Sequence, residues 1–191
     1  MIKKTLLLVG VALALVVAAG PGSALATWTH NGSELTEEAE VELSGPVAIE
    51  VPGVAGAHFT LHLKKRFFPF LWTGQYTSAQ VTNCTGTGAL NGFTCTGTAL
   101  GLPWTFHKPL FSSRIRITNV RILLHYYLPS DTTHASPIAQ TTTEGDVIAT
   151  PDNGEAFSSF EFEGEGMTTN GNPSTLSGEL AVTPAGTYGG E

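Results

Sequence analysis

The chain has 191 residues, with 22 glycines and 11 prolines, and only 13% of its residues are charged while 41% are hydrophobic. It has too few charges for a disordered acidic chain or a charged coiled coil, and too many hydrophobic residues for a low-complexity tail. The net charge of −7 excludes a strongly basic nucleic-acid-binding protein, and the length predicts one domain.

The first 26 residues have the pattern of a secretory signal peptide. Lys3 and Lys4 give a positive start, Leu6–Ala19 is an apolar run, and Ala24-Leu25-Ala26 supplies small residues at alternate positions. The alternative is an uncleaved anchor helix. This run of 14 residues would span about 21 Å, which is less than the ~30 Å core of a bilayer. We therefore predict cleavage after Ala26, secretion, and a mature domain over 27–191 without a transmembrane segment.

Apolar and polar residues alternate along most of 27–191. The alternating segments cover 39–43, 47–51, 59–63, 115–126, 160–162 and 180–182, and Gly45-Pro46 predicts a turn between the first two. A period of two with Gly, Pro, Asn and Asp between segments is typical of an antiparallel sheet with one solvated face. We predict an all-β domain of eight to ten strands, either a jelly-roll-like antiparallel β-sandwich or a closed β-barrel.

Cys84 and Cys95 are the only cysteines. In an exported protein such a pair predicts a disulfide. The Gly-rich interval 85–94 can turn the chain back, so the bond would join neighbouring strands, with 86–101 interpreted as a strand pair around it. A metal site is the alternative, but two cysteines without a His or third Cys at ligand spacing do not favour it. Residues 131–140 and 167–174 are expected to be exposed loops.

A run of three cations followed by five large apolar residues around Pro69 interrupts the alternation. Because Pro69 cannot donate to a strand ladder, a central strand is not expected there. As an exposed hairpin tip, this run would form an interaction loop for a membrane interface or hydrophobic partner; folded inward, it would be part of the core. The loop candidates are Lys64, Lys65, Arg66, Phe67, Phe68, Phe70, Leu71 and Trp72.

Charge is segregated along the chain. Residues 51–130 contain no Asp or Glu, yet they hold all seven positive side chains of 27–191. One interpretation is that basic strands pair with acidic strands, with Arg114 and Arg116 opposite Glu161, Glu163 or Glu165. The other is a basic face for anionic polymers or lipid headgroups, with Lys108, Arg114, Arg116 and Arg121 as its candidates.

Aromatic residues and histidines allow two further interpretations. One interpretation of the aromatic residues is a sugar-stacking platform, and core packing is the simpler one, above all for Trp104. The six candidates are Trp28, Trp72, Trp104, Tyr76, Tyr126 and Tyr127. Tyr126 and Tyr127 must point to opposite faces of a strand, so one of them is expected to be exposed. His58 and His62 lie about 13 Å apart on one strand face, too far for one metal ion. We therefore predict no metal and no cofactor.

No catalytic motif is present. The sequence contains no G-x-S-x-G elbow, H-E-x-x-H pair or phosphate-binding loop. Glu161 and Glu163 would lie about 7 Å apart on one strand face, a spacing that nominally suits glycoside hydrolysis. On an alternating, solvated strand they are most simply surface carboxylates, so no catalytic residue is assigned.

Several short motifs resemble a group of uncharacterised, exported all-β proteins of actinobacterial type. The motifs are Asn83-Cys84-Thr85-Gly86-Thr87-Gly88, Gly101-Leu102-Pro103-Trp104, Ala149-Thr150-Pro151-Asp152-Asn153 and Val182-Thr183-Pro184-Ala185-Gly186-Thr187-Tyr188. The resemblance implies an all-β fold, bacterial origin and export, but no activity. Relatives of this type often have a second cysteine pair, which this chain lacks.

Together these features predict an exported, non-catalytic β-domain that acts as a binding or structural protein at the cell surface or in the extracellular space. The expected partners are an anionic cell-wall polymer, a polysaccharide or a membrane surface, and not a nucleic acid. Two alternatives are a small extracellular hydrolase acting on polysaccharide and a β-barrel carrier of an apolar ligand.

Overall fold

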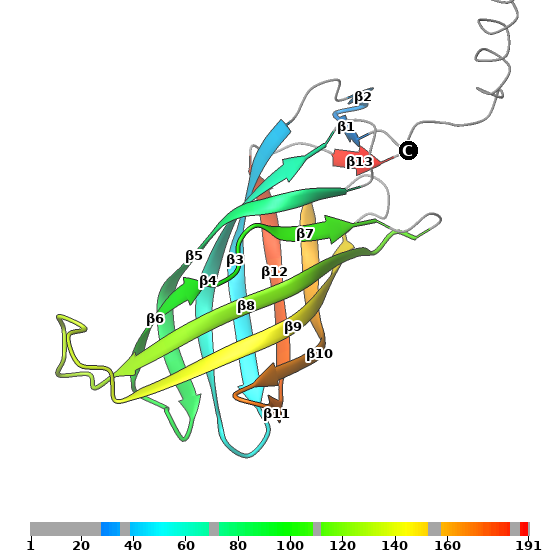
Figure 1. Ribbon diagram of the computed structural model, residues 1–191. Helices are drawn as coiled ribbons and strands as arrows, with labels where there is room; N and C mark the ends of the chain where they lie inside the picture. Colours follow the sequence, from blue (N-terminus) through cyan, green and yellow to red (C-terminus); the bar gives the residue numbers. More distant parts are fainter. Residues whose placement is uncertain are drawn as a thin grey trace, which may run out of the picture.

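The computed structural model describes residues 28–34, 39–68, 73–108, 112–152, 158–183 and 188–190. The predicted signal peptide lies outside these ranges. The described residues form strands without a helix, as predicted (Figure 1). The strands of the main sheet are β3 (Ala39–Val51), β4 (Ala55–Phe67), β5 (Thr73–Gly88), β6 (Thr94–Ala99), β7 (Trp104–His107), β8 (Ile115–Tyr127), β9 (Ala139–Pro151), β10 (Ser159–Thr169), β11 (Asn172–Pro173) and β12 (Thr175–Thr183).

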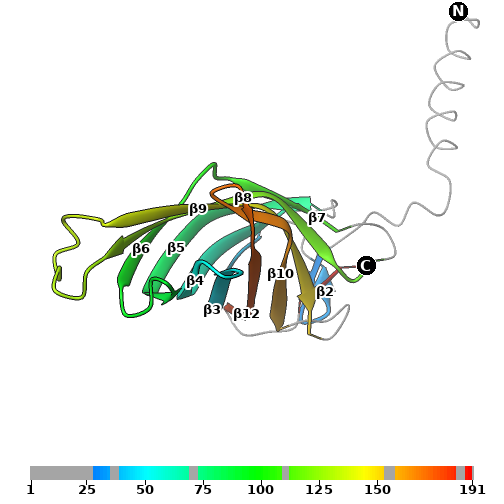
Figure 2. The ribbon, with the colours of Figure 1, turned by 90° about the horizontal axis from the view of Figure 1, so that it is seen from below.

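The main sheet closes on itself. Each wall strand pairs antiparallel with its neighbour in the order β3, β4, β5, β6, β8, β9, β10 and β12, and β12 returns to pair with β3. Strand β7 fills the wall between β5 and β8 beyond the end of β6. Seen from below, the strands follow one another around one ring (Figure 2). Of the two predicted architectures, these pairings describe the closed barrel.

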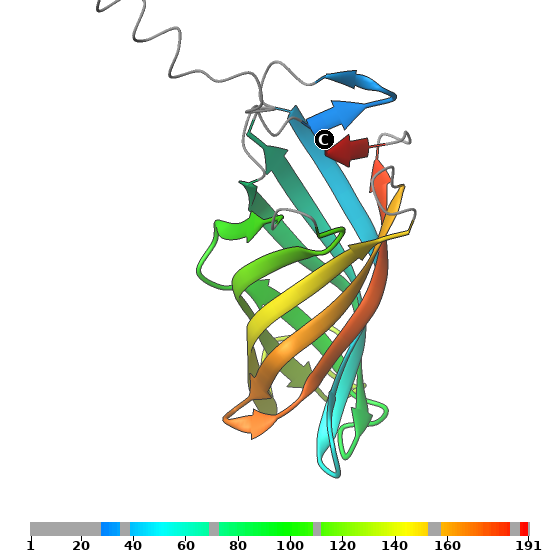
Figure 3. The same cartoon turned by 90° about the vertical axis from the view of Figure 1, so that its right-hand side faces the viewer.

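A small second sheet joins the two ends of the described chain. It contains β1 (Trp28–His30), β2 (Ser33–Glu34) and β13 (Tyr188–Gly190), with β1 in the middle. Figure 3 shows this sheet at the end of the barrel where β3 begins and β12 finishes.

The predicted alternation places the apolar residues inside the barrel. The inward side chains of β3, β4, β8, β10 and β12 are almost fully buried, among them Leu43, Ile49, Phe59, Ile117 and Phe160. An eight-stranded barrel is just wide enough to be filled by such side chains or to hold one small ligand.

Gly45-Pro46 does not form the predicted turn, because β3 runs through it from Ala39 to Val51. Pro46 has no N–H to donate, and the register between β3 and β12 skips this point, passing from Val47↔Gly178 to Ser44↔Ala181. A Cβ at Gly45 would overlap the carbonyl oxygen of Glu179. The pair therefore allows a close approach of the two strands instead of reversing the chain.

Two other expectations about exposure are wrong. Met167 and Thr169 are buried in β10, so the expectation of an exposed loop over 167–174 is wrong for these two residues, although the hairpin tip over 170–173 is exposed. Tyr126 and Tyr127 point to opposite faces, yet both are buried. The loop between β8 and β9 covers Tyr127, whose ring centroid lies 4.7 Å from that of His134.

The disulfide is present where the sequence predicted it. Cys84 on β5 and Cys95 on β6 are register partners, and their sulfurs are bonded. Both cysteines are buried. The bond therefore fastens two adjacent wall strands.

Candidate functional site

The run that was predicted as an interaction loop is mostly the end of strand β4. Lys64, Lys65, Arg66 and Phe67 continue the alternation of this strand, and the half-buried Phe68 follows it. Lys65 and Phe67 face the interior with 0% and 1% exposure, so the exposed-loop interpretation is wrong for these two residues. Phe70, Leu71 and Trp72 lie outside the described residues.

Two of the four residues of the predicted basic face, Arg116 and Arg121, form ion pairs. The Arg116 Nη2 atom lies 2.9 Å from Asp146 and 3.3 Å from Glu165, and Arg121 Nε lies 3.0 Å from Glu144. Arg114 is exposed. Lys108 is only 6% exposed and so offers little charge to a surface. The strand-pairing interpretation of the segregated charges is therefore the one that these contacts support.

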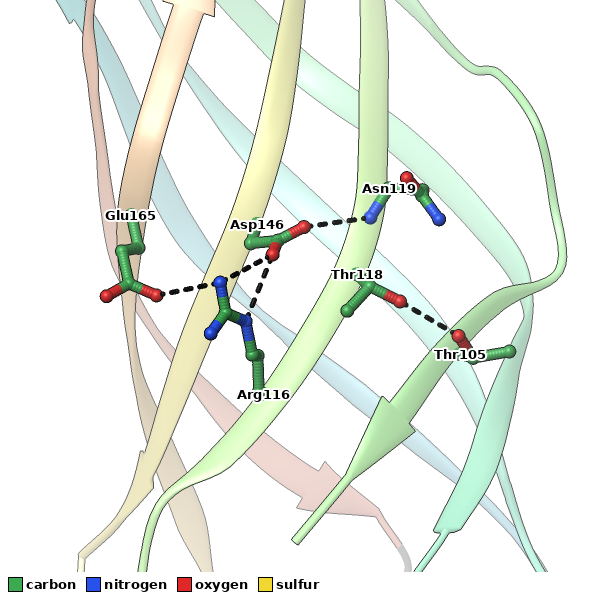
Figure 4. A network of polar contacts seen from close by, with 6 residues as sticks. All are labelled: Thr105, Arg116, Thr118, Asn119, Asp146 and Glu165. Atoms are coloured by element: carbon green, nitrogen blue, oxygen red, sulfur yellow. Dashed lines mark hydrogen bonds and ion pairs between the residues drawn. The ribbon is translucent and has the colours of Figure 1, made fainter. Parts of the chain in front are cut away.

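Figure 4 shows the Arg116 network at a point where the wall bends. Asp146 accepts hydrogen bonds from Arg116 Nε at 3.0 Å and from the Asn119 backbone N–H at 3.2 Å. Asn119 has a φ of 59°, and the register between β8 and β9 shifts between Ile117 and Val120. The carboxylate thus holds a β-bulge in place, which is a structural role.

The remaining catalytic and metal candidates stay on the surface. Glu161 and Glu163 are exposed on β10, where Glu161 is the register partner of Glu179. His58 and His62 are exposed on β4. Within the described ranges, no three His, Cys, Asp or Glu side chains are grouped so that they could hold a metal ion.

A polar groove runs across the outer face of β12, β3, β4 and β5. Its volume is about 200 Å³. The register forms two rows of outward side chains, one through Thr183, Glu42, Lys64 and Ser78 and the other through Ser44, His62 and Gln80. We call these seven residues the outer groove.

The chemistry of the outer groove is mixed, with hydroxyl, amide, imidazole, carboxylate and ammonium groups on neighbouring strands. The Lys64 ammonium lies 3.7 Å from both Glu40 and Glu42. His62 Nε2 lies 3.0 Å from Thr82 Oγ1. A bulge in β5 between the partners of Lys64 and Lys65 turns Ser78 toward the groove. Both hydrogen-bond donors and acceptors are therefore fixed on one rigid surface.

Inside the barrel, the Lys65 side chain lies among aromatic rings. Its Nζ atom is 4.3 Å from the Phe106 centroid, 4.5 Å from that of Phe160, 4.6 Å from that of Phe67 and 5.8 Å from that of Tyr76. We call these four rings the aromatic box. Burial lowers the pKa of Lys65 well below its ordinary value and raises the pKa of the Tyr76 hydroxyl.

Lys64 lies on the solvated face of β4, as the alternation indicates, whereas Lys65, grouped with it in the candidate loop, lies inside the barrel. Phe59, Leu61 and Leu63 point inward at odd positions, and continuing that pattern would have put Lys65 and Phe67 inside and Lys64 outside. The other groove residues were missed because they are ordinary polar residues at solvated positions. Only the strand register brings them together.

No family model matches this chain, and no curated protein or solved structure is significantly similar to it. The resemblance to exported actinobacterial proteins therefore stays a prediction. None of the described segments is a helix of the length and hydropathy that a membrane span requires.

Proposed function

We propose that the protein is an exported, non-catalytic binding protein that recognises a neutral polysaccharide through the outer groove. The observation that carries this proposal is the pair of register-aligned rows, which present donors and acceptors from adjacent strands of a rigid wall. Sugar hydroxyls both donate and accept, so they suit such a surface. The signal-peptide pattern and the disulfide support export.

Charge favours a neutral polymer over an anionic one. Lys64, the cation that lines the groove, has two carboxylates within 3.7 Å. An anionic chain that approached Lys64 would also meet Glu40 and Glu42, whose like charges repel it. We therefore choose polysaccharide among the predicted partners, ahead of an anionic wall polymer or a lipid surface.

Co-sedimentation of the purified protein with insoluble cellulose, chitin and isolated cell walls tests the proposal, at low salt and at 1 M salt. Binding to a neutral polymer should persist at 1 M salt, where the Debye length is about 3 Å. The variant Gln80→Ala should reduce the affinity about fivefold, the equivalent of ~1 kcal/mol for one lost hydrogen bond.

The matched control is Gln140→Ala, because Gln140 is an exposed glutamine on the outer face of β9 and far from the groove residues in the strand order. It should bind like the unaltered protein. Binding that disappears at 1 M salt, or that both variants weaken equally, would show that the outer groove is not a site for a neutral polysaccharide.

A further inference from the structure

Lys65 has an environment that is unusual for a lysine. Its side chain starts on β4, where its register partner is Tyr76 on β5, and its amine lies close to Phe160 on β10. Strands β3 and β12 separate β4 from β10 in the wall, so the side chain reaches across the interior. The amine is 0% exposed.

Two effects compete over the charge of this amine. Three ring centroids at 4.3–4.6 Å favour the ammonium through cation–π attraction. Removing the ammonium from water disfavours it, even after relaxation of the protein. Desolvation is the larger effect, and it lowers the pKa of Lys65. Lys65 therefore has a larger fraction of neutral, nucleophilic amine than an exposed lysine.

An apolar hollow of about 260 Å³ lies beside the aromatic box. Phe68, Gly74 and Phe106 line it together with side chains on the outer faces of β5, β7 and β8. Phe106 belongs both to the hollow and to the aromatic box, so the ring that lines the hollow also lies 4.3 Å from the amine. A Cβ at Gly74 would overlap the Phe106 ring, which shows that this glycine provides the space in which the ring sits.

We propose that Lys65 anchors a small apolar aldehyde, which enters from this hollow, displaces the Phe106 ring and condenses with the Lys65 amine to form an imine. The amine lone pair attacks the carbonyl carbon, a C–N bond forms, and the carbonyl oxygen takes up a proton. The oxygen then leaves as water after a second proton transfer, and a C=N bond remains. No oxidant or reductant is needed, and hydrolysis releases the ligand.

Tyr76 supplies a hydrogen-bond donor close to this reaction. Its side chain is fully buried, and its hydroxyl has no hydrogen-bond partner within the described ranges. Because burial raises the pKa of this phenol, it remains protonated at neutral pH. It can therefore donate to the ligand oxygen while the carbinolamine forms. This site is separate from the outer groove, so the inference does not rest on polysaccharide binding.

Reductive trapping tests the proposal. The purified full-length protein is incubated at pH 7 with octanal and sodium cyanoborohydride, which reduces an imine to a stable secondary amine, and the adduct is located by peptide mass spectrometry. We expect one main adduct, on Lys65. The variant Lys65→Met should lower the labelling of lysine side chains about tenfold, because an exposed lysine is almost fully protonated at this pH.

Lys64→Met is the matched control, since Lys64 is the adjacent residue on the outer face of the same strand. It should leave the labelling unchanged, and Thr118→Trp, which fills the hollow, should reduce it. Peptide mapping of the unaltered protein locates the adduct even if Lys65→Met fails to fold. Equal labelling of Lys64, Lys108 and the N-terminal amine, no labelling, or binding of octanoate without an octanal adduct would each overturn the proposal.

Discussion

Asp146 shows how one carboxylate can act on both a side chain and the backbone. Its two oxygens accept from Arg116 and from the N–H of Asn119 at the β8 bulge. We predict that Asp146→Ala lowers the free energy of unfolding by about 1–2 kcal/mol. The reason is that the charged Asp146 carboxylate accepts a hydrogen bond from Asn119, whose backbone has a left-handed conformation. Urea denaturation measures the change.

Loss of the Arg116 side chain should lower the free energy of unfolding less than loss of Asp146. Arg116 is 51% exposed at its side chain, and exposed ion pairs contribute about 0.2–1 kcal/mol. Arg116→Ala should therefore cost less than Asp146→Ala and about as much as Arg121→Ala, which breaks a comparable pair with Glu144. Equal losses for Asp146→Ala and Arg116→Ala would mean that the Asn119 hydrogen bond does not stabilise the fold.

At the scale of the strand, a small residue on one strand must lie beside a large residue on the neighbouring strand. Gly97 on β6 faces Val81 on β5, and a Cβ at Gly97 would lie 2.6 Å from the Val81 Cβ. We predict that Gly97→Ala lowers the free energy of unfolding by about 1–3 kcal/mol through overpacking. In the double variant Val81→Ala/Gly97→Ala the two changes should compensate. Additive losses in a double-mutant cycle would contradict this packing argument.

The disulfide acts on the β5–β6 pair. It closes a short loop between Cys84 and Cys95, which lie 11 positions apart, and the chain-entropy relation gives about 3 kcal/mol for a loop of this length. We predict that Cys84→Ala/Cys95→Ala lowers the free energy of unfolding by about that amount in urea denaturation. The unaltered protein with dithiothreitol should behave like the double variant. A reductant effect on the double variant itself would point to a cause other than the disulfide.

Alternation in the sequence was enough to predict β3, β4, β8, β10 and β12 and their buried faces, because burial on one side imposes a period of two. It failed where the backbone departs from regular pleating. Gly45-Pro46 has the composition of a turn, and only the interrupted ladder with β12 explains its place inside β3. The change from Lys64 outside to Lys65 inside was obscured by treating the cationic run as a separate unit.

At the scale of the whole molecule, closure of the barrel could not be predicted from the sequence. A sandwich and a barrel use the same alternating strands, and the difference lies in which edge strands pair. Here β9 pairs with both β8 and β10, and β12 returns to β3. Closure also brings Thr183 of β12 to the outer groove and Phe160 of β10 to the aromatic box, whose other residues come from strands β3, β4, β5 and β7. Local patterns carry little information about such pairings.

The buried lysine should give the whole molecule a distinctive pH dependence. The folded-state pKa of Lys65 is lowered, so between that value and about 10.4 the unfolded chain binds more protons than the folded one. Stability should therefore rise with pH over this window. Above about pH 10 it should fall, since the raised pKa of Tyr76 makes the folded state retain a proton that the unfolded chain loses.

Lys65→Met isolates this effect, because methionine has a similar length and no charge to desolvate. We predict that it raises the free energy of unfolding at pH 7 by about 1–4 kcal/mol, the range found when buried charges are replaced by apolar groups. The gain should shrink as the pH approaches 10, and Lys64→Met should leave the profile parallel to that of the unaltered protein. Urea denaturation at intervals between pH 6 and pH 10 measures the free energy of unfolding of the unaltered protein and of both variants. Profiles for Lys65→Met and the unaltered protein that run parallel across this range would show that Lys65 titrates like an exposed lysine, which is incompatible with its enclosure by the aromatic box.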